Sequence, residues 1–483
     1  MNNESRTPSP LISVIPLIAL VGMVSLVVIM FGSDALGGGS QIALLFGSAI
    51  CVALSMSIYH RPWLDFEEGI KQTLGSTSVS IVILLLIGML SGAWMISGVV
   101  PTMIYYGVQI MSPQFFLVCT CVICAAVSVM TGSSWTTIAT IGVALLGIGE
   151  ALAIPVGWTA GAIISGAYFG DKISPLSDTT VLAATASDTE LFTHIRYMML
   201  TTTPSFLVAV AVFFIAGLVY GGSSDVQVSA YTEGLSRGFT ITLWSLLIPL
   251  FMGVLIVKKV PSLITLFASA LLAGIFSLFV QTDVLIGLSG DANPDSLSAL
   301  KGMMISFFTS TSVDTGNDQL NSLVSTGGMA GMLNTIWLIL CAMCFGGCMV
   351  ASGMIHSLMS ALLRGVQSTV GLVSSTALTG VLMNVVTSDQ YISIIMTANM
   401  YRDAYKRSGH ESRLLSRTTE DAATVTSVLV PWNTCGMTQA TVLGVATMTY
   451  LPYCIFNYVS PLMSVLVAAM GWRIKKQNNN ENQ

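Results

Sequence analysis

The sequence predicts an all-α polytopic membrane protein built from two inverted repeats. Hydrophobic residues fill 53% of its 483 positions and charged residues only 8%, against roughly 25% charged in a typical soluble domain. Apolar runs recur along the chain, each close to the roughly 20 residues that a helix needs to cross a bilayer. Two further stretches carry a polar tip between apolar segments, and each precedes a helix broken at a proline. We therefore expect about five transmembrane helices, a re-entrant hairpin and a broken helix in each repeat.

The composition also narrows the classes of function. The net charge of −5 is small and diffuse, which argues against a nucleic-acid partner. The nine cysteines are dispersed through apolar segments, where a free thiol behaves as a small hydrophobe rather than as a metal ligand. The sequence contains no nucleotide-binding loop and no hydrolase motif. We expect a secondary transporter in the lipid bilayer, not an enzyme, and no bound cofactor.

The first repeat is predicted over residues 11–220, behind an N-terminal tail at 1–10. The tail lacks the cationic start of a signal peptide, so the first apolar run should be a retained span. Spans are expected at 11–31, 41–58, 79–98 and 198–220. The connections should include a polar loop with His60, Arg61, Asp65, Glu67, Glu68 and Lys71, an interfacial segment at 101–111, and a loop with His194 and Arg196.

The centre of the first repeat is a hairpin at 113–150 followed by a broken helix at 155–186. The hairpin tip is the polar run Thr131–Thr137, and such backbone is tolerated at membrane depth only where protein or a water-filled cavity satisfies it. The broken helix begins with small residues, which let neighbouring helices approach closely. Charged and helix-breaking residues then follow within eight positions: Asp171, Lys172, Pro175 and Asp178. A proline breaks the helical hydrogen-bond ladder, and a charge inside a membrane usually marks an ion pathway.

The second repeat is predicted over residues 238–470, between a linker at 221–237 and a C-terminal tail at 471–483. Spans are expected at 238–257, 261–280 and 329–352, with a last one ending near 470. The segment 281–328 is acidic and should face outward, with Asp283, Asp291, Asp295, Asp314 and Asp318 against a single Lys301. A second hairpin is expected at 368–400, with its tip at Asn384–Gln390, and a second broken helix at 418–446, interrupted at Pro431–Gly436.

Weak internal symmetry relates the two halves. At an offset of 254 to 256 residues, Thr131–Ser133 falls on Thr387–Asp389, and Pro175–Asp178 falls on Pro431–Thr434. The expected loop at 401–417 carries five cations, whereas its counterpart at 147–155 carries one acid and no cation. Because cytoplasmic loops are rich in Lys and Arg, the second half should be inverted and both termini should be cytoplasmic.

Broken helices suit Na⁺, a hard cation that takes oxygen ligands, because they supply free carbonyls and hydroxyls at membrane depth. The candidate ion-binding residues are Ser133, Ser134, Asp171, Ser174, Asp178, Thr387, Ser388, Asp389, Asn433 and Thr434. Poor solvation favours the protonated form of a carboxylate, which can then exchange its proton for a metal ion. The break of the second half has Asn433 and Thr434 where that of the first half has Ser177 and Asp178, so the carboxylates at the breaks lie only in the first half. We therefore expect Asp171 and Asp178 to carry proton coupling and, with Asp389, to hold Na⁺.

The three aspartates also have structural interpretations, which stay open at this point. Asp171 could form an ion pair with Lys172, and Asp178 could cap the helix that restarts at Thr179. Asp389 could make local hydrogen bonds at the hairpin tip.

Other polar residues are expected to be structural. Glu420 and Asp421 follow the basic loop and should cap the first turn of the next helix, where acids are favourable. His194 and His356 are expected to be structural rather than proton relays.

Four motifs together resemble the NhaC family of bacterial sodium/proton antiporters. They are GAYFGDKISPLSDTT at 166–180, TGSSWTT at 131–137, TSDQY at 387–391 and VPWNTCG at 430–436. The resemblance runs over about residues 10–470 and implies the two-hairpin inverted-repeat fold of the ion transporter superfamily. It further implies an antiporter of the bacterial inner membrane that exchanges cytoplasmic Na⁺ for external H⁺. The site that it implies consists of Asp171, Ser174 and Asp178 in one half with Asp389 and Asn433 in the other.

The resemblance leaves an alternative, because some relatives of that family exchange carboxylates. The alternative is an Na⁺- and H⁺-coupled exchanger of the malate/lactate type with the same fold. A small carboxylate substrate would then need a counter-charge such as Lys172 or Arg364. The motifs do not separate the two functions, and they leave the ion stoichiometry and a homodimeric assembly open.

Overall fold

The computed structural model describes residues 8–31, 37–220, 225–295, 297–363, 366 and 368–474. Within these ranges the regular structure is helical, apart from an isolated antiparallel bridge between Thr311 and Thr326. Eight described helices are long and apolar enough to cross a membrane, or up to ten spans if each of two bent helix pairs counts as one. The predicted all-α, multi-pass fold class is confirmed.

The first half contains the predicted hairpin and broken helix between long helices. The long helices are α1 (Pro10–Phe31), α2 (Gly39–Tyr59), α3 (Trp63–Ile96) and α10 (Leu191–Tyr220), with the shorter α4 (Val99–Ile110) after α3. One hairpin arm is α5 (Phe116–Thr131), and the other joins α6 (Ser134–Thr137), the π-helical turn η2 (Ile138–Gly142) and α7 (Val143–Ala151). The broken helix is α8 (Val156–Ile173) followed by α9 (Asp178–Ala186).

The second half repeats this order after a different beginning. It starts with α11 (Asp225–Gly238), η3 (Leu243–Leu246), α12 (Leu247–Val257), α13 (Ser262–Val280), α14 (Thr282–Ser289), α15 (Ser298–Phe308), α16 (Asp318–Leu323), η4 (Ala330–Met332), α17 (Leu333–Ala351) and α18 (Met354–Leu363). The hairpin is α19 (Thr369–Thr387) with α20 (Gln390–Arg407). The broken helix consists of α21 (Ser412–Thr419), the π-helical η5 (Glu420–Thr424), η6 (Ser427–Leu429) and α22 (Thr434–Leu443), and α23 (Thr447–Tyr450), η7 (Leu451–Tyr453) and α24 (Ile455–Ala469) end the fold.

Several segments predicted as loops are helical. Most of the polar loop after the second span forms the first turns of α3, His194 and Arg196 lie in α10, and the described part of the linker 221–237 belongs to α11. The predicted loop at 401–417 shrinks to residues 408–411 between α20 and α21. The segment predicted as one span at 238–257 is bent, because η3 and α12 lie at an angle of 89° to the end of α11.

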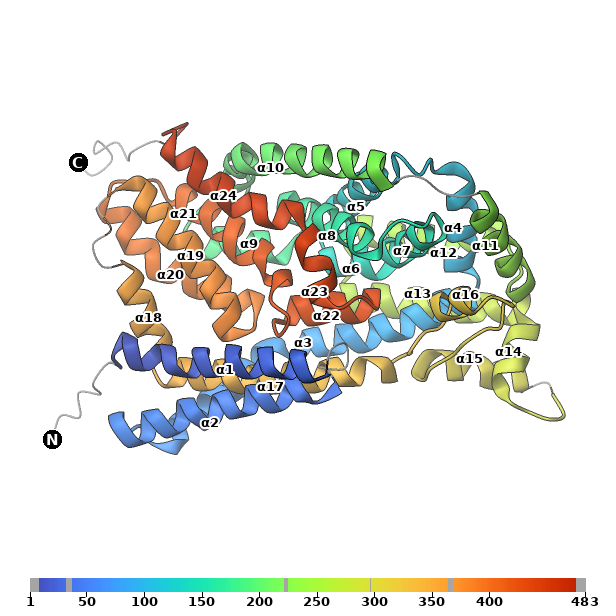
Figure 1. Cartoon of the computed structure of the whole chain (residues 1–483), viewed down its shortest axis with the longest axis horizontal. Coiled ribbons are helices and arrows are strands. Elements are labelled where there is room, and N and C mark those ends of the chain that lie inside the picture. The colour runs from blue at the N-terminus through green and yellow to red at the C-terminus, as the bar shows by residue number, and fades with distance from the viewer. Residues whose placement is uncertain are drawn as a thin grey trace.

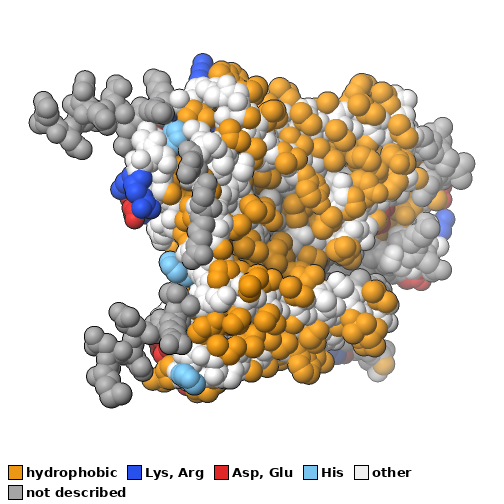
Figure 2. All heavy atoms as spheres, turned by 60° about the vertical axis from the view of Figure 1, so that its left-hand side comes forward, with side chains coloured by type: hydrophobic (Ala, Val, Ile, Leu, Met, Phe, Trp, Pro, Cys, Tyr) orange, Lys and Arg blue, Asp and Glu red, His pale blue; other side chains and the backbone are white. Residues whose placement is uncertain are grey.

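The molecule has an apolar middle and charged ends. The first residues of α1, the last residues of α24 and the α20–α21 connection lie at one end of the long axis, and α11, α14, α15 and α16 lie at the other (Figure 1). On the face shown in Figure 2, hydrophobic side chains cover the middle, and charged side chains gather toward the two ends. The end with α14–α16 carries the predicted cluster of aspartates.

Close glycine contacts pack α8 against its neighbours. A Cβ atom added at Gly166 would lie 2.1 Å from the Cys121 carbonyl oxygen, and one at Gly170 would lie 2.3 Å from that of Ala125. Both carbonyls belong to α5, so α8 and the first hairpin arm meet backbone to backbone, as small residues four apart allow. This contact fixes the hairpin tip beside the end of α8, where the helix breaks.

Candidate ion-binding site

The first hairpin tip is a polar turn closed by its own hydroxyl groups. Gly132 adopts a left-handed conformation (φ 65°) after α5, and Ser133 caps α6 by accepting a hydrogen bond from the Thr136 backbone N–H at 3.2 Å. The Thr131 hydroxyl bonds to the Ser133 carbonyl and to the Thr137 hydroxyl. These hydrogen bonds close the turn internally, and Gly132 lies directly against Leu176 in the break that follows α8.

The break between α8 and α9 spans residues 174–177 and follows from Pro175, which cannot continue the ladder. The Ser174 hydroxyl donates to the Val129 carbonyl of α5 at 2.8 Å. Ser177 is the N-cap of α9 and accepts from the Thr180 N–H. Asp178 is therefore the first residue of α9 and not its cap, which leaves its carboxylate available to other partners.

Asp171 lies on the last turn of α8 and is bound directly by the hairpin tip. Its Oδ2 atom accepts hydrogen bonds from the Ser134 backbone N–H at 3.1 Å and from the Ser134 hydroxyl at 2.7 Å. Asp171 as a whole is only 6% exposed to solvent. The tip thus supplies the carboxylate with donors but with no cation.

Asp171 and Asp178 line one small cavity of about 90 Å³. The tip, the break and the start of α20 enclose most of it, and the polar residues of its wall are Ser80, Thr131, Ser133, Thr136, Ser177, Thr179, Ser262, Gln390 and Tyr391. The Tyr391 hydroxyl donates to the Asp178 carboxylate at 3.5 Å. The cavity therefore joins two carboxylates of the first half to residues from the second hairpin.

The second hairpin tip reproduces the hydrogen bonds of the first. The Thr387 hydroxyl bonds to the Asp389 carbonyl and to the Ser393 hydroxyl, as Thr131 does at the corresponding positions. Ser388 takes the left-handed conformation (φ 59°) that Gly132 has in the first tip. Asp389 caps α20 by accepting from the Ile392 N–H at 2.9 Å. This cap confirms the turn-forming interpretation of Asp389, which does not line the cavity around Asp171.

The second break is held to this tip by neutral groups. Asn433 caps α22 by accepting from the Cys435 N–H, and its amide donates to the Asn384 carbonyl at 3.1 Å. The Thr434 N–H donates to the Ser388 carbonyl at 2.8 Å, and its hydroxyl approaches the Asp389 carboxylate at 3.5 Å. Thr387, Ser388, Asp389, Asn433 and Thr434 thus form a second group, separate from the Asp171 cavity.

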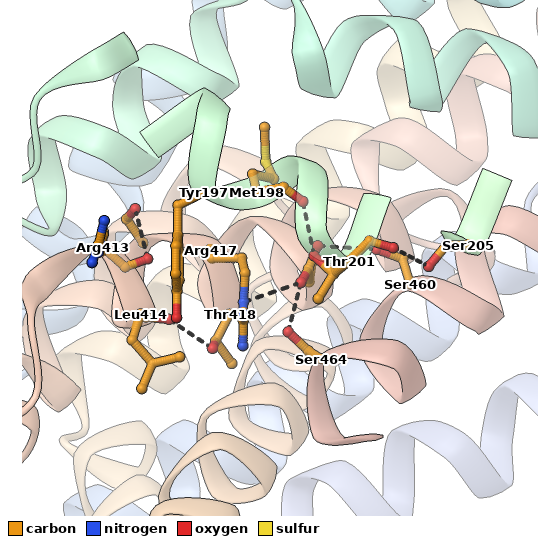
Figure 3. Close-up of polar contacts among 12 residues, drawn as sticks. Tyr197, Met198, Thr201, Ser205, Arg413, Leu414, Arg417, Thr418, Ser460 and Ser464 are labelled. Carbon is orange, nitrogen blue, oxygen red and sulfur yellow. Dashed lines mark hydrogen bonds and ion pairs between the residues drawn. The ribbon is translucent and has the colours of Figure 1, made fainter. Parts of the chain in front are cut away.

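A buried charge cluster lies beside these two groups. Lys172 forms an ion pair with Asp421 and donates to the Ser460 hydroxyl at 2.9 Å. Asp421 also accepts from the Ser464 hydroxyl at 2.5 Å and lies 3.9 Å from the Arg417 Nε atom. Lys172, Asp421 and Arg417 are fully buried. In Figure 3 the Arg417 guanidinium faces the side where Thr201 and Ser464 lie.

This cluster corrects two predictions. Lys172 is paired with Asp421 of the second half and not with Asp171. Asp421 and Glu420 do not cap a helix, because α21 begins at Ser412 and places both acids two turns further on, inside the protein.

The histidine prediction is partly tested. His194 is buried and its Nδ1 atom bonds to the Ser416 hydroxyl at 2.5 Å, a contact between α10 and α21 that fits a structural role. His356 lies exposed on α18.

Among the described residues no three His, Cys, Asp or Glu side chains converge on a common metal position. Neutral oxygens would have to supply most ligands of any cation here.

The structure adds Gln390 and Tyr391 to the site, although neither is among the candidates predicted from the sequence. Both directly follow Asp389 at the start of α20, and this position beside the hairpin tip is the feature of the sequence that could have indicated them. Gln390 also donates from its side-chain amide to the Thr424 carbonyl at 2.9 Å, where the π-helical turn leaves carbonyls free of regular partners. For Asp421 the indication of a buried charge is weaker, since it consists only of an acid among small and hydroxyl residues.

Comparisons with known proteins give consistent similarities. Residues 166–472 match the model of the Na⁺/H⁺ antiporter family. The chain is 34% identical over 425 residues to the Na⁺/H⁺ antiporter NhaC of Bacillus subtilis (strain 168), covering 88% of this chain and 91% of that one. It is 36% identical over 421 residues to the Na⁺/H⁺ antiporter NhaC of Alkalihalophilus pseudofirmus, covering 87% and 88%. It is also 33% identical over 442 residues to the malate-2H⁺/Na⁺-lactate antiporter of Bacillus subtilis (strain 168), covering 91% of each.

Proposed function

Since the chain belongs to the Na⁺/H⁺ antiporter family, we propose that it is a secondary transporter that extrudes cytoplasmic Na⁺ in exchange for H⁺. The family model covers the breaks of both broken helices, and the two NhaC relatives are similar over most of the chain. The ions are cargo, so this function requires a site that binds and releases them rather than a resident cofactor. We place the cargo at the cavity of Asp171 and Asp178.

The observation that carries this proposal is the position of Asp171. Its carboxylate is buried at a helix break, accepts two hydrogen bonds from a hairpin tip and has no cation among those bonding partners. Two hydrogen bonds offset only part of the cost of burying a charged carboxylate, so binding a proton or a metal ion stabilises it further. Competition between the two at Asp171, with Asp178 on the same cavity, would couple Na⁺ to H⁺.

We propose that the two halves form inverted repeats around this site. The shared hydrogen-bond pattern of the two tips supports a common origin of the hairpins. In this arrangement the basic end, where α20 meets α21, is cytoplasmic under the positive-inside rule. Both termini would then face the cytoplasm of a bacterial inner membrane, and the end with α14–α16 would face outward.

The second candidate function is Na⁺- and H⁺-coupled exchange of a small carboxylate, favoured by the similarity to the malate-2H⁺/Na⁺-lactate antiporter. Such a substrate needs an available cation. Lys172 is already paired with Asp421, and Arg364 lies outside the described residues. Among the described residues no Lys or Arg lines the Asp171 cavity, which favours ion exchange without an organic substrate at that site.

Reconstituted vesicles separate the two functions. Purified protein in proteoliposomes should acidify or alkalinise the lumen when an Na⁺ gradient is imposed with no organic anion present. Addition of malate or lactate should leave the initial rate unchanged. A pH change that requires malate or lactate would reject Na⁺/H⁺ exchange in favour of the carboxylate exchanger.

A further inference from the structure

A pocket of about 430 Å³ lies at the basic end of the molecule, away from the ion site. Its wall brings together cationic side chains from three separate segments, and its residues are Thr193, Arg196, Tyr197, Leu200, Arg413 and Arg473. Arg196 belongs to α10, Arg413 to α21, and Arg473 follows α24. Because these segments are far apart in sequence, the fold itself assembles the three arginines around one space.

The acids nearby offset only part of the positive charge of the three arginines, with Glu190 close enough to interact electrostatically with Arg196. Arg413 forms an ion pair with Glu411. Glu190 receives hydrogen bonds from the Phe192 and Thr193 backbone N–H groups and from the Thr193 hydroxyl at the start of α10. Among the described residues no carboxylate lies within 4.0 Å of the Arg196 or Arg473 guanidinium. The pocket therefore has an excess of positive charge.

Tyr197 fixes the shape of the pocket. Its hydroxyl donates to the Arg473 carbonyl at 3.2 Å, and its ring lies 4.8 Å from the Arg413 guanidinium carbon. Arg417 of the buried charge cluster lies 4.9 Å from the same ring, and Figure 3 shows Tyr197 between Arg413 and Arg417. The Tyr197 ring would thus separate a group bound in the pocket from the buried charge cluster that contains Arg417 and Lys172.

Exposed apolar side chains flank the pocket on the same segments. Phe192 is 57% exposed at the start of α10, and Leu466, Met470 and Trp472 are 51%, 58% and 50% exposed on and after α24. Large apolar side chains of this kind, with a tryptophan at the helix end, are typical of the boundary between hydrocarbon and headgroups. These side chains are therefore suited to contact lipid beside the pocket.

We propose that this pocket binds the phosphate of an anionic lipid headgroup. Arginine guanidinium groups match phosphate oxygens in geometry and charge, and basic pockets between helices at a cytoplasmic surface are suited to such headgroups. Arg196 and Arg473 bind the phosphate, Arg413 and Tyr197 shape the wall, and the acyl chains lie against the apolar flank. This site is independent of the proposed ion exchange and rests on the cytoplasmic orientation proposed above for this end of the molecule.

The test measures binding and needs no transport. Purified, delipidated full-length protein is titrated with phosphatidylglycerol, with phosphatidylcholine, and with the soluble headgroup glycerophosphoglycerol, and the thermal unfolding midpoint is followed, since a ligand that binds the folded state raises it. Phosphatidylglycerol should raise the midpoint more than phosphatidylcholine. In Arg196→Gln/Arg473→Gln the apparent affinity for phosphatidylglycerol should fall about 30-fold, taking the usual contribution of one basic side chain at an anionic bilayer surface for each arginine.

The matched control removes two cations from the same end outside the pocket. Lys406→Gln/Arg407→Gln should keep the wild-type response, because both residues are exposed at the end of α20 and neither lines the pocket. Equal losses in the two double variants would mean general attraction of charge and would overturn the site. A full effect from glycerophosphoglycerol alone would mean a soluble anion and would overturn the lipid. Arg473→Glu provides a second variant, which should abolish the preference for phosphatidylglycerol.

Discussion

Neutralising Asp421 is expected to destabilise the protein more than neutralising its partner Lys172. Asp421→Asn leaves two buried cations, Lys172 and Arg417, without their carboxylate. Lys172→Met leaves Asp421 with hydroxyl donors from Ser460 and Ser464 and with Arg417 at 3.9 Å. The second variant therefore retains a cation and two hydroxyl donors for the remaining carboxylate. The first variant leaves two cations without their ion-pair partner, with only weaker contacts such as the Ser460 hydroxyl for Lys172 and the Tyr197 ring for Arg417.

The magnitude follows from the burial of the pair. Breaking a buried ion pair by removing one partner costs about 3–5 kcal/mol. Asp421→Asn should lie at or above the upper end of this range and Lys172→Met at or below the lower end. At about 2 °C per kcal/mol in a chain of this length, Asp421→Asn should lower the unfolding midpoint by roughly 10 °C.

Thermal unfolding of the purified variants in detergent, read out by size-exclusion chromatography, measures both the order and the coupling. The double variant Lys172→Met/Asp421→Asn should cost less than the sum of the single variants, by about 0.5–3 kcal/mol, because the side chains are in contact. Equal midpoints for the two single variants, or strictly additive losses in the double variant, would refute the ion pair as the structural link between α8 and the second broken helix.

Three further predictions concern the tip, a buried acid and the acidic end. Gly132→Ala should lower both Na⁺/H⁺ exchange and the unfolding midpoint, because a Cβ atom there would lie 2.7 Å from backbone at the helix break. Gly444→Ala, at the similar φ of 66° with no atom within 4 Å, isolates the backbone cost of about 1–2 kcal/mol and should spare transport. Glu420→Gln should leave the unfolding midpoint nearly unchanged. Both buried carboxylate oxygens of Glu420 lack a well-formed hydrogen bond among the described residues, so the ionised form would be costly and the substitution removes little stabilisation. A large fall in the midpoint would contradict this. At the acidic end a hydrogen bond from Lys301 holds the pKa of the Asp291 carboxyl below its ordinary value. The stabilisation is then present above the ordinary pKa of an aspartate and is lost as the pH falls through the lowered pKa of Asp291. Asp291→Asn should therefore lower the unfolding midpoint at neutral pH and leave it unchanged in strong acid. A midpoint difference that persists in strong acid would exclude this pair as its cause.

Apolar runs predict the positions of several helices well, whereas polar runs do not show where those helices begin and end. The spans at 11–31, 261–280 and 329–352 agree with α1, α13 and α17 to within a few residues. The polar residues after α2, which the sequence predicts as a loop, form exposed turns of α3 stabilised by pairs such as Lys71 with Glu67 at 2.8 Å. Charge in these segments reports distance from the membrane centre and not the end of a helix.

The candidate site was predictable where it depends on local sequence. A proline within a small-residue helix and a run of hydroxyl residues at a hairpin tip each follow from backbone chemistry, and the predicted tips and breaks are present. The partners across the fold were not predictable, because Lys172 and Asp421 are 249 residues apart and neither segment shows its partner. The same holds for Tyr391, which reaches Asp178 only because the second hairpin packs against α9.

The most direct test of the central proposal compares Asp171→Asn with Asp188→Asn in proteoliposomes under an imposed Na⁺ gradient. Asn keeps the volume of Asp171 and an acceptor for Ser134 but cannot exchange a proton for Na⁺. Asp188 is an exposed residue between α9 and α10 that pairs with Arg402 and Lys406, outside the cavity. We predict that Asp171→Asn reduces Na⁺-driven proton flux to the level of protein-free liposomes and that Asp188→Asn retains it. Wild-type flux in Asp171→Asn would contradict the assignment of ion coupling to this site.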